Sequence, residues 1–175
     1  MSQALAARLA ERGVLLADGG MGTGLFARGL ETGDSPELWN VTAADRVQDV
    51  HREFIAAGAD LVLTNSFGGN APRLQLHDAA GRVDELNRAA AANAREAAAA
   101  ADRPVLVAGS MGPTGELLAP LGRLEPAEAE AAFRAQAFAL AAGGVDLLWV
   151  ETMSAAAELT VAVRAAQTTG LPGVA

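Results

Sequence analysis

Two carboxylates, Asp18 and Glu151, each directly follow a run of apolar residues. Asp18 comes after Val-Leu-Leu-Ala at 14–17, and Glu151 comes after Leu-Leu-Trp-Val at 147–150. If these runs are parallel strands, both carboxylates lie at the rim where ligands bind in α/β proteins. A carboxylate there can bind a substrate ammonium or act as a base. The alternatives are a local turn for Asp18 and a favourable place at the start of a helix for Glu151.

Glycine residues follow Asp18 closely, in the stretch Asp-Gly-Gly-Met-Gly-Thr-Gly at 18–24. Gly19 and Gly20 would let backbone N–H groups approach an anionic ligand such as a carboxylate. A dinucleotide-binding G-x-G-x-x-G pattern is not formed, because Leu25 occupies the third glycine position.

Hydroxyl and amide side chains follow the two middle apolar runs. Thr64, Asn65 and Ser66 come directly after Leu-Val-Leu at 61–63, and Gly-Ser-Met-Gly-Pro-Thr-Gly occupies 109–115. These groups can hydrogen-bond a polar ligand, and the alternative is an ordinary turn at the end of a strand.

Side chains that bind metals are scarce in this chain. It has no Cys and two His residues, His51 and His77, whose spacing matches no ligand pair. We therefore predict no metal site built from this chain alone, and we interpret both histidines as structural or surface residues.

The pattern of apolar residues predicts the elements that must position these groups. Each run is continuously apolar, as in strands buried on both faces, and helical spacing fills the intervals. We expect Thr42 and Asp45 to form a capping box at the start of the first helix. The predicted strands lie at 14–17, 61–63, 105–108 and 147–150, with a fifth beginning at 173–175, and the predicted helices lie at 42–57, 83–94, 126–140 and 155–168.

This alternation of strand and helix predicts an α/β fold with a parallel sheet and right-handed crossovers. Both an open doubly wound sheet and part of a (β/α)8 barrel fit the spacing. The stretch from Leu25 to Val41 is long for such a connection, which favours a functional role. Trp39 within it is either a packing anchor or part of a lid over a ligand.

Composition excludes several classes of protein. Hydrophobic residues make up 51% of the chain and charged residues 19%, so a disordered chain is excluded. The net charge of −8 argues against a nucleic-acid partner. No signal peptide is visible, and no uncharged apolar run reaches the roughly 18–20 residues that span a bilayer. We expect a cytoplasmic protein without a membrane partner.

Four motifs together resemble the homocysteine S-methyltransferase family. They are Asp-Gly-Gly-Met-Gly-Thr at 18–23, Gly-Ala-Asp-Leu-Val-Leu-Thr-Asn-Ser-Phe-Gly-Gly-Asn at 58–70, Gly-Ser-Met-Gly-Pro-Thr-Gly at 109–115 and Val-Glu-Thr-Met at 150–153. The resemblance extends from about residue 12 to the end of the chain. Its specificity comes from the four motifs occurring in the right order.

The resemblance implies a (β/α)8 TIM barrel, of which this chain would hold about the first four βα units and the start of strand 5. Residues 1–175 would then be the N-terminal part of a single homocysteine-binding domain. The implied reaction transfers a methyl group from a small donor, such as betaine or S-methylmethionine, to the homocysteine sulfur to give methionine. A homo-oligomer is compatible with this assignment.

The resemblance also implies how homocysteine binds. Its ammonium would contact Asp18 and Glu151, and its carboxylate would meet the backbone around Gly19 and Thr64. Two acids for a cation and glycine-turn amides for an anion suit a zwitterionic amino acid. The predicted substrate-binding residues are Asp18, Gly19, Gly20, Thr64, Asn65, Ser66 and Glu151.

Zinc is the cofactor that the family implies, held by three Cys thiolates that activate the homocysteine sulfur. This chain has no Cys, so we expect those ligands beyond residue 175 and no methyl transfer by this chain alone. It also has no Tyr, which disfavours betaine because a quaternary ammonium prefers an aromatic face. One alternative is a non-catalytic half-barrel that binds an amino acid or pairs with a second chain. Another is a barrel enzyme whose acids move a proton at carbon.

Overall fold

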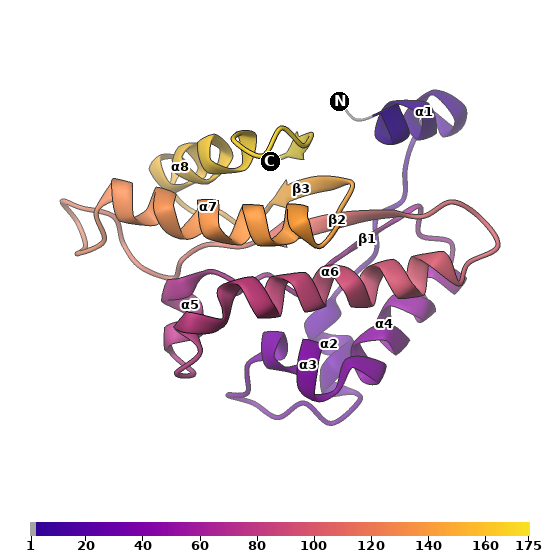
Figure 1. The fold of residues 1–175 in the computed structure, drawn as a ribbon, viewed down its shortest axis with the longest axis horizontal. Coiled ribbons are helices and arrows are strands. Elements are labelled where there is room, and N and C mark those ends of the chain that lie inside the picture. Colours follow the sequence, from indigo (N-terminus) through magenta and orange to yellow (C-terminus); the bar gives the residue numbers. More distant parts are fainter. Residues whose placement is uncertain (1–2) are drawn as a thin grey trace.

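The computed structural model describes residues 3–175, and a parallel sheet lies at its centre (Figure 1). The strands are hydrogen-bonded in sequential order, and they are β1 (Leu61–Leu63), β2 (Leu106–Met111), β3 (Leu147–Val150) and β4 (Gly173–Val174).

The predicted strand at 14–17 is reduced to a single parallel bridge between Ala17 and Leu61. It lies beside β1, as expected, but its backbone is bonded irregularly. The N–H of Leu16 donates to the side chain of Asp60, and the N–H groups of Asp60 and Leu61 share the Leu16 carbonyl. A side chain thus takes the place of a strand carbonyl, and no regular ladder forms.

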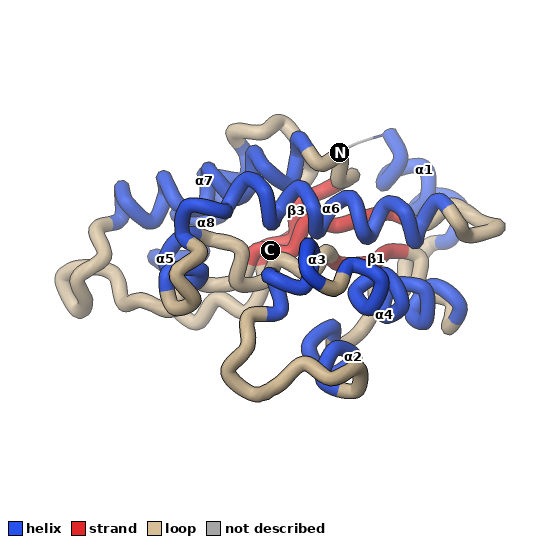
Figure 2. The backbone as a smooth tube through the Cα atoms, turned by 60° about the horizontal axis from the view of Figure 1, so that its bottom comes forward, coloured by secondary structure: helices blue, strands red, loops and turns tan. Residues whose placement is uncertain are grey.

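Figure 2 shows the helices that pack against the sheet. Four correspond to the predicted ones, and the remaining short helices were not predicted. No helix between residues 3 and 175 is both long enough and apolar enough to cross a membrane. The α-helices are α1 (Gln3–Arg12), α2 (Met21–Phe26), α3 (Trp39–Thr42), α4 (Ala44–Ala56), α5 (Ala71–Gln75), α6 (Val83–Ala99), α7 (Pro126–Ala142) and α8 (Ala156–Gln167), and the 3₁₀ helices are η1 (Pro36–Leu38) and η2 (Ala80–Arg82).

The capping box predicted at Thr42 and Asp45 is wrong. Thr42 ends α3, where its hydroxyl donates to the carbonyl of Leu38, and α4 begins without a side-chain cap. The extra turn of α3 therefore takes the residue that the pattern assigned to the cap. A capping box does occur at the start of α7, between Glu125 and Glu128.

The two faces of the sheet are covered differently. One face, with Val62, Val107 and Leu148, packs under α4, α6, α7 and α8, where Phe133 of α7 is fully buried. The other face carries a smaller cluster that Leu5 of α1 contacts. A doubly wound sheet has helices on both faces and a reversal of strand order. The sequential order and the shared helical face therefore do not fit that alternative.

Candidate functional site

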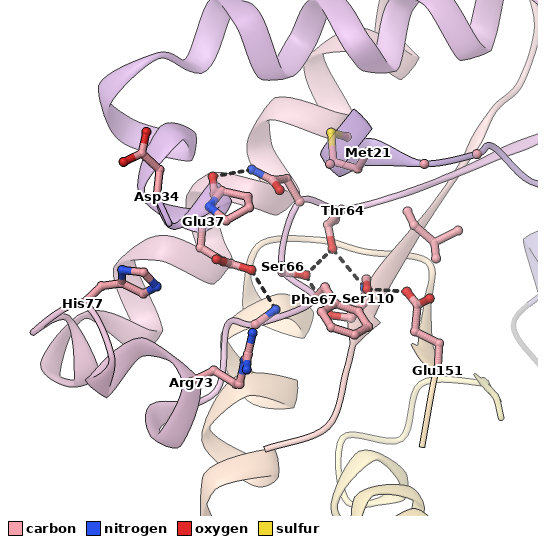
Figure 3. Close-up of a pocket in the computed structure, with 17 residues that line it drawn as sticks. Met21, Asp34, Glu37, Thr64, Ser66, Phe67, Arg73, His77, Ser110 and Glu151 are labelled. Atoms are coloured by element: carbon pink, nitrogen blue, oxygen red, sulfur yellow. Dashed lines mark hydrogen bonds between the residues drawn. The ribbon is translucent and has the colours of Figure 1, made fainter. Parts of the chain in front are cut away.

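A cavity of about 340 Å³ opens at the rim where the strands end, and Figure 3 shows the side chains around it. Its volume is at the lower end of the range for pockets that hold small ligands. Parallel strands bring their carboxyl ends to one rim, so motifs distant in sequence meet there. Six of the seven predicted residues line the cavity: Gly19, Gly20, Thr64, Asn65, Ser66 and Glu151.

Asp18, the seventh predicted residue, is half-buried beside the cavity. Its Oδ2 accepts a hydrogen bond of 2.9 Å from the N–H of Leu63 at the end of β1. Burial raises the pKa of the Asp18 carboxyl to about 7, and the nearby charge of Glu151 adds to the increase, while the bond from Leu63 opposes it. Asp18 is therefore partly protonated near neutral pH, and a cation bound there would favour its ionised form.

Glu151 is held by a hydroxyl from the neighbouring strand. The Oγ of Ser110, in β2, donates to its Oε1 at 2.6 Å. The next residue, Thr152, has a φ of 60°, in the left-handed region that non-glycine residues rarely adopt. Such strain is common at ligand sites, because the surrounding structure must enforce it. The turn after β3 therefore presents Glu151 in a fixed position.

Three buried hydroxyls form a chain between β1 and β2. Ser66 Oγ donates its proton to the Ser110 carbonyl at 2.7 Å. Because that proton is used, Thr64 Oγ1 must be the donor in the 2.6 Å hydrogen bond between the two hydroxyls. Thr64 Oγ1 also accepts from the N–H of Ser110 at 3.0 Å. Since Ser110 Oγ donates to Glu151, all three hydroxyl protons of this network are already used in hydrogen bonds. The network positions the carboxylate of Glu151 and leaves no hydroxyl free to donate to a ligand.

The backbone amides of the glycine turn remain available to an anion. The N–H of Thr64 donates to the carbonyl of Ala108, so this amide is not free. Within residues 3–175, the N–H groups of Gly19 and Gly20 have no acceptor. Among the predicted site residues, the backbone donors that directly follow Asp18 and remain unpaired within residues 3–175 are thus the amides of Gly19 and Gly20.

Asn65 supports the wall of the cavity through its amide. Its Nδ2 donates to the carbonyl of Pro36 and to Asn40 Oδ1, and Asn40 Nδ2 donates back to the Asn65 carbonyl at 2.8 Å. This reciprocal pair fixes the long loop at 25–41 against the end of β1. Trp39 in that loop packs in a small core cluster, with the guanidinium of Arg46 5.2 Å from its ring centre, so it is a packing anchor.

Glu37 is a buried carboxylate in the cavity wall that we did not predict. It accepts hydrogen bonds from the N–H of Gly68 at 2.7 Å and from Ser35 Oγ at 2.8 Å. A Cβ at position 68 would lie 2.8 Å from Glu37 Oε1, so glycine is required for this approach. The only sequence signal for this residue was the unusual length of its loop.

Arg73, at the other end of the cavity, was also not predicted as a site residue. It belongs to α5, which follows the turn after β1, and its side chain is half-buried. Asp34 and His77 line the same end and are exposed. No local pattern separates Arg73 from the other arginines in the sequence. Within residues 3–175 its guanidinium has no hydrogen-bond or ion-pair partner, and this depends on tertiary contacts.

The described residues do not fit a zinc site. Between residues 3 and 175 no three side chains of the ligating types cluster closely enough to hold a metal. His51 is fully buried in α4, and neither of its ring nitrogens has a hydrogen-bond partner within this range. Burial lowers the pKa of His51 to about 4, so the ring is neutral. His51 lies outside the set that lines the cavity.

Comparison with known proteins identifies relatives along almost the whole chain. A family model described as homocysteine S-methyltransferase matches residues 15–174. Methionine synthase of Mycobacterium tuberculosis (strain ATCC 25618 / H37Rv) is 38% identical over 159 residues, covering 86% of this chain and 13% of that protein. Methionine synthase of Mycobacterium leprae (strain TN) is 37% identical over 166 residues, covering 89% of this chain and 13% of that protein.

Solved structures of similar fold include the homocysteine methyltransferase MmuM from Escherichia coli. Its metallated form superposes with a TM-score of 0.81 at 26% identity, covering 96% of this chain and 64% of that chain. Its oxidized form gives the same TM-score and identity, with 63% of that chain covered. The chain therefore spans less than two thirds of MmuM and a small part of the methionine synthases.

Proposed function

Because this chain belongs to the homocysteine S-methyltransferase family, we propose that it forms the homocysteine-binding part of an enzyme that methylates the homocysteine sulfur to give methionine. The observation that carries this proposal is the pair of neighbouring carboxylates, Asp18 and Glu151, beside the free amides of Gly19 and Gly20. A cation site next to an anion site matches the ammonium and carboxylate of an amino acid.

We also propose that residues 1–175 supply about the first four βα units and the start of strand 5 of a (β/α)8 barrel. Two features support this: the strands follow one another in sequential parallel order, and the four long helices share one face of the sheet. In such a barrel the rim at the strand ends carries the ligand, which is where the cavity lies.

In the proposed complex, the homocysteine ammonium lies between the carboxylates of Asp18 and Glu151. Its positive charge lowers the pKa of Asp18 from about 7, so binding displaces the proton that burial favours on the free carboxyl. Ser110 keeps Glu151 turned toward the ligand. The homocysteine carboxylate accepts hydrogen bonds from the amides of Gly19 and Gly20, and the rest of the side chain extends along the cavity.

Zinc would supply a Lewis acid that keeps the homocysteine sulfur as a thiolate. Because residues 3–175 hold no ligand set for it, we propose that its ligands lie outside this chain. The contribution of this chain is to bind and orient the amino acid.

The proposal is tested by titrating L-homocysteine into the purified chain in a calorimeter. We expect saturable binding that Asp18→Asn and Glu151→Gln each weaken at least tenfold, about 1.4 kcal/mol. The matched control is Asp49→Asn, an exposed carboxylate on α4 that pairs with Arg52. Absence of binding to the wild-type chain would contradict the proposal. Turnover of homocysteine with a methyl donor by the isolated chain would contradict the assignment of the zinc ligands.

A further inference from the structure

Gln136 is a fully buried amide behind the rim of the sheet, in the middle of α7. Its Nε2 donates to the carbonyl of Ser66 at 2.7 Å and to the carbonyl of Ser110 at 3.4 Å. Both neighbours are acceptors only, so the NH₂ group of the amide must point toward them. One side chain thus joins the turn after β1 to β2. The other residues that α7 buries are all apolar, and they are Ala129, Phe133, Ala137, Ala139 and Leu140.

The need of the two carbonyls for a donor does not explain this amide, because each has another one. The N–H of Gly69 donates to the carbonyl of Ser66 at 2.9 Å, and Ser66 Oγ donates to the carbonyl of Ser110 at 2.7 Å. The Oε1 of Gln136 is buried and has no hydrogen-bond partner within residues 3–175. Burying an unpaired amide oxygen opposes folding. An apolar side chain would therefore suit the core better, and the presence of glutamine indicates a role other than stability.

The two residues that Gln136 contacts belong to the hydroxyl network that holds Glu151. Ser110 receives hydrogen bonds from Ser66 Oγ and Gln136 at its carbonyl, and its own Oγ donates to Glu151 Oε1 at 2.6 Å. Figure 3 shows this network leading from Thr64 through Ser110 to Glu151. Gln136 lies outside the set that lines the cavity. Its effect on a ligand would therefore be transmitted through Ser110.

We propose that Gln136 is a positioning residue for homocysteine. It holds the turn at Ser66 against β2, so that the Ser110 hydroxyl points at Glu151 and the Glu151 carboxylate faces the substrate ammonium. This inference rests on the proposed function. Without the amide both carbonyls keep a donor, but the turn can move relative to β2 and take the Ser110 hydroxyl with it. The loss then falls on ligand affinity and not on folding.

The variant Gln136→Met separates these two quantities, because it keeps the length of the side chain and removes its donor. We expect its unfolding free energy in urea to be no lower than that of the wild-type chain, since the unpaired Oε1 is removed as well. In calorimetry we expect L-homocysteine to bind about fivefold more weakly. A residue that served stability alone would show the opposite pattern.

The matched control is Phe133→Leu, which changes a fully buried apolar side chain one turn earlier on the same helix. It leaves a cavity in the core, so we expect a lower unfolding free energy. Its homocysteine affinity should stay within twofold of the wild type. A fivefold loss of affinity in this control as well would make the effect a general consequence of α7 packing and overturn the inference.

A double-mutant cycle with Ser110→Ala tests the path from Gln136 to Glu151. Ser110→Ala removes the hydroxyl that donates to Glu151, so we expect it to weaken homocysteine binding by itself. In that background Gln136→Met should weaken binding less than twofold further, because the group through which it acts is already absent. Full additivity of the two changes would overturn the path through Ser110.

The outcomes distinguish this inference from the proposed function. If the wild-type chain binds homocysteine and Gln136→Met binds it equally well, the inference is wrong and the homocysteine site stands. The same conclusion follows if Gln136→Met loses as much stability as Phe133→Leu. If the wild-type chain does not bind homocysteine, the proposed function is wrong and this inference fails with it.

Discussion

At the scale of single residues, the cavity combines a carboxyl group of raised pKa with a carboxylate fixed by a hydroxyl. Asp18 is kept partly protonated by burial and by the charge of Glu151, while Ser110 donates to Glu151. The two acids thus have different environments, although both follow apolar runs of similar composition. Their difference comes from what surrounds each carboxyl group in the fold.

We expect Asp18 to make the unfolding free energy depend on pH. Its folded pKa of about 7 lies above the ordinary 3.8, so the folded chain holds a proton that the unfolded chain loses between these values. The associated stability is present below pH 3.8 and is lost as pH rises through 7. Asp18→Asn should therefore gain stability relative to the wild type on going from pH 4 to pH 7.5, by at most about 4 kcal/mol.

Urea denaturation of both proteins across this pH range measures that difference. Asp49→Asn, which removes an exposed carboxylate, is the control and should run parallel to the wild type. If the unfolding free energy of Asp18→Asn changed with pH in parallel with that of the wild type, the raised pKa of Asp18 would be wrong.

Sequence reasoning identified the site residues by type and place but not by their bonds. Asp18 and Glu151 were selected because each directly follows an apolar run, at the rim where parallel strands present ligand-binding groups. The sequence analysis placed the homocysteine carboxylate near the backbone of both Gly19 and Thr64. The structure was needed to exclude the Thr64 amide, because its N–H already donates to the carbonyl of Ala108. Arg73 stood out only once its neighbours were known.

At the scale of elements, the loop at 25–41 is tied to the turn after β1 by two independent links. Glu37 accepts from the N–H of Gly68, and Asn40 exchanges hydrogen bonds with Asn65. Together these links close one wall of the cavity. Asp34, Pro36 and Glu37 of this loop line the cavity. The functional role that the length of the loop favours stays a prediction.

We expect Glu37→Ala to lower the unfolding free energy by about 1–3 kcal/mol, because it leaves the buried N–H of Gly68 without an acceptor. Glu37→Gln should lose less, since its carbonyl can accept from Gly68 and its amide can donate to Ser35. Glu31→Ala, an exposed change in the same loop, is the control. Chemical denaturation measures all three, and equal stability of Glu37→Ala and Glu31→Ala would disprove the link.

The long helices were predictable and the short elements were not. α6 carries apolar residues at helical spacing along its 17 residues, which is a strong local signal. α7 is Ala-rich on all sides, and Pro126 at its start and Gly143 after its end mark its bounds. The strand expected at 14–17 and the capping box expected at Thr42 failed for a different reason. Both depend on tertiary or neighbouring hydrogen bonds. The side chain of Asp60 accepts from the N–H of Leu16 in the first case, and Thr42 is part of the extra helical turn α3 in the second.

At the scale of the whole molecule, the sheet has open edges and one lightly covered face. Within residues 3–175, β4 pairs only with β3, and the outer edge of β1 carries only the single bridge to Ala17. Val14 and Leu16 beside that bridge are 78% and 58% exposed. Open strand edges and exposed apolar side chains promote association between chains.

We therefore expect the isolated 175-residue chain to self-associate as its concentration rises. Size-exclusion chromatography with light scattering between about 1 and 100 μM measures this directly. Leu16→Lys, which places a charge at the open edge, should shift the equilibrium toward monomer. A monodisperse monomer at every concentration would count against both the self-association and the alternative of a half-barrel that pairs with a second chain.

The amino-acid sequence by itself determined the parallel arrangement of alternating strands and helices and the polar residues at the strand ends, because both follow from local patterns of residue type. Only the tertiary structure decided which hydrogen-bonding groups around the cavity are paired within the protein and which remain available to a ligand. Gln136 of α7 donates to the carbonyl of Ser66, whereas in the described part of the chain, residues 3–175, the amides of Gly19 and Gly20 and the guanidinium of Arg73 have no hydrogen-bond partner. Such pairings join residues far apart in the chain, so their presence or absence is settled only when the whole sheet is assembled.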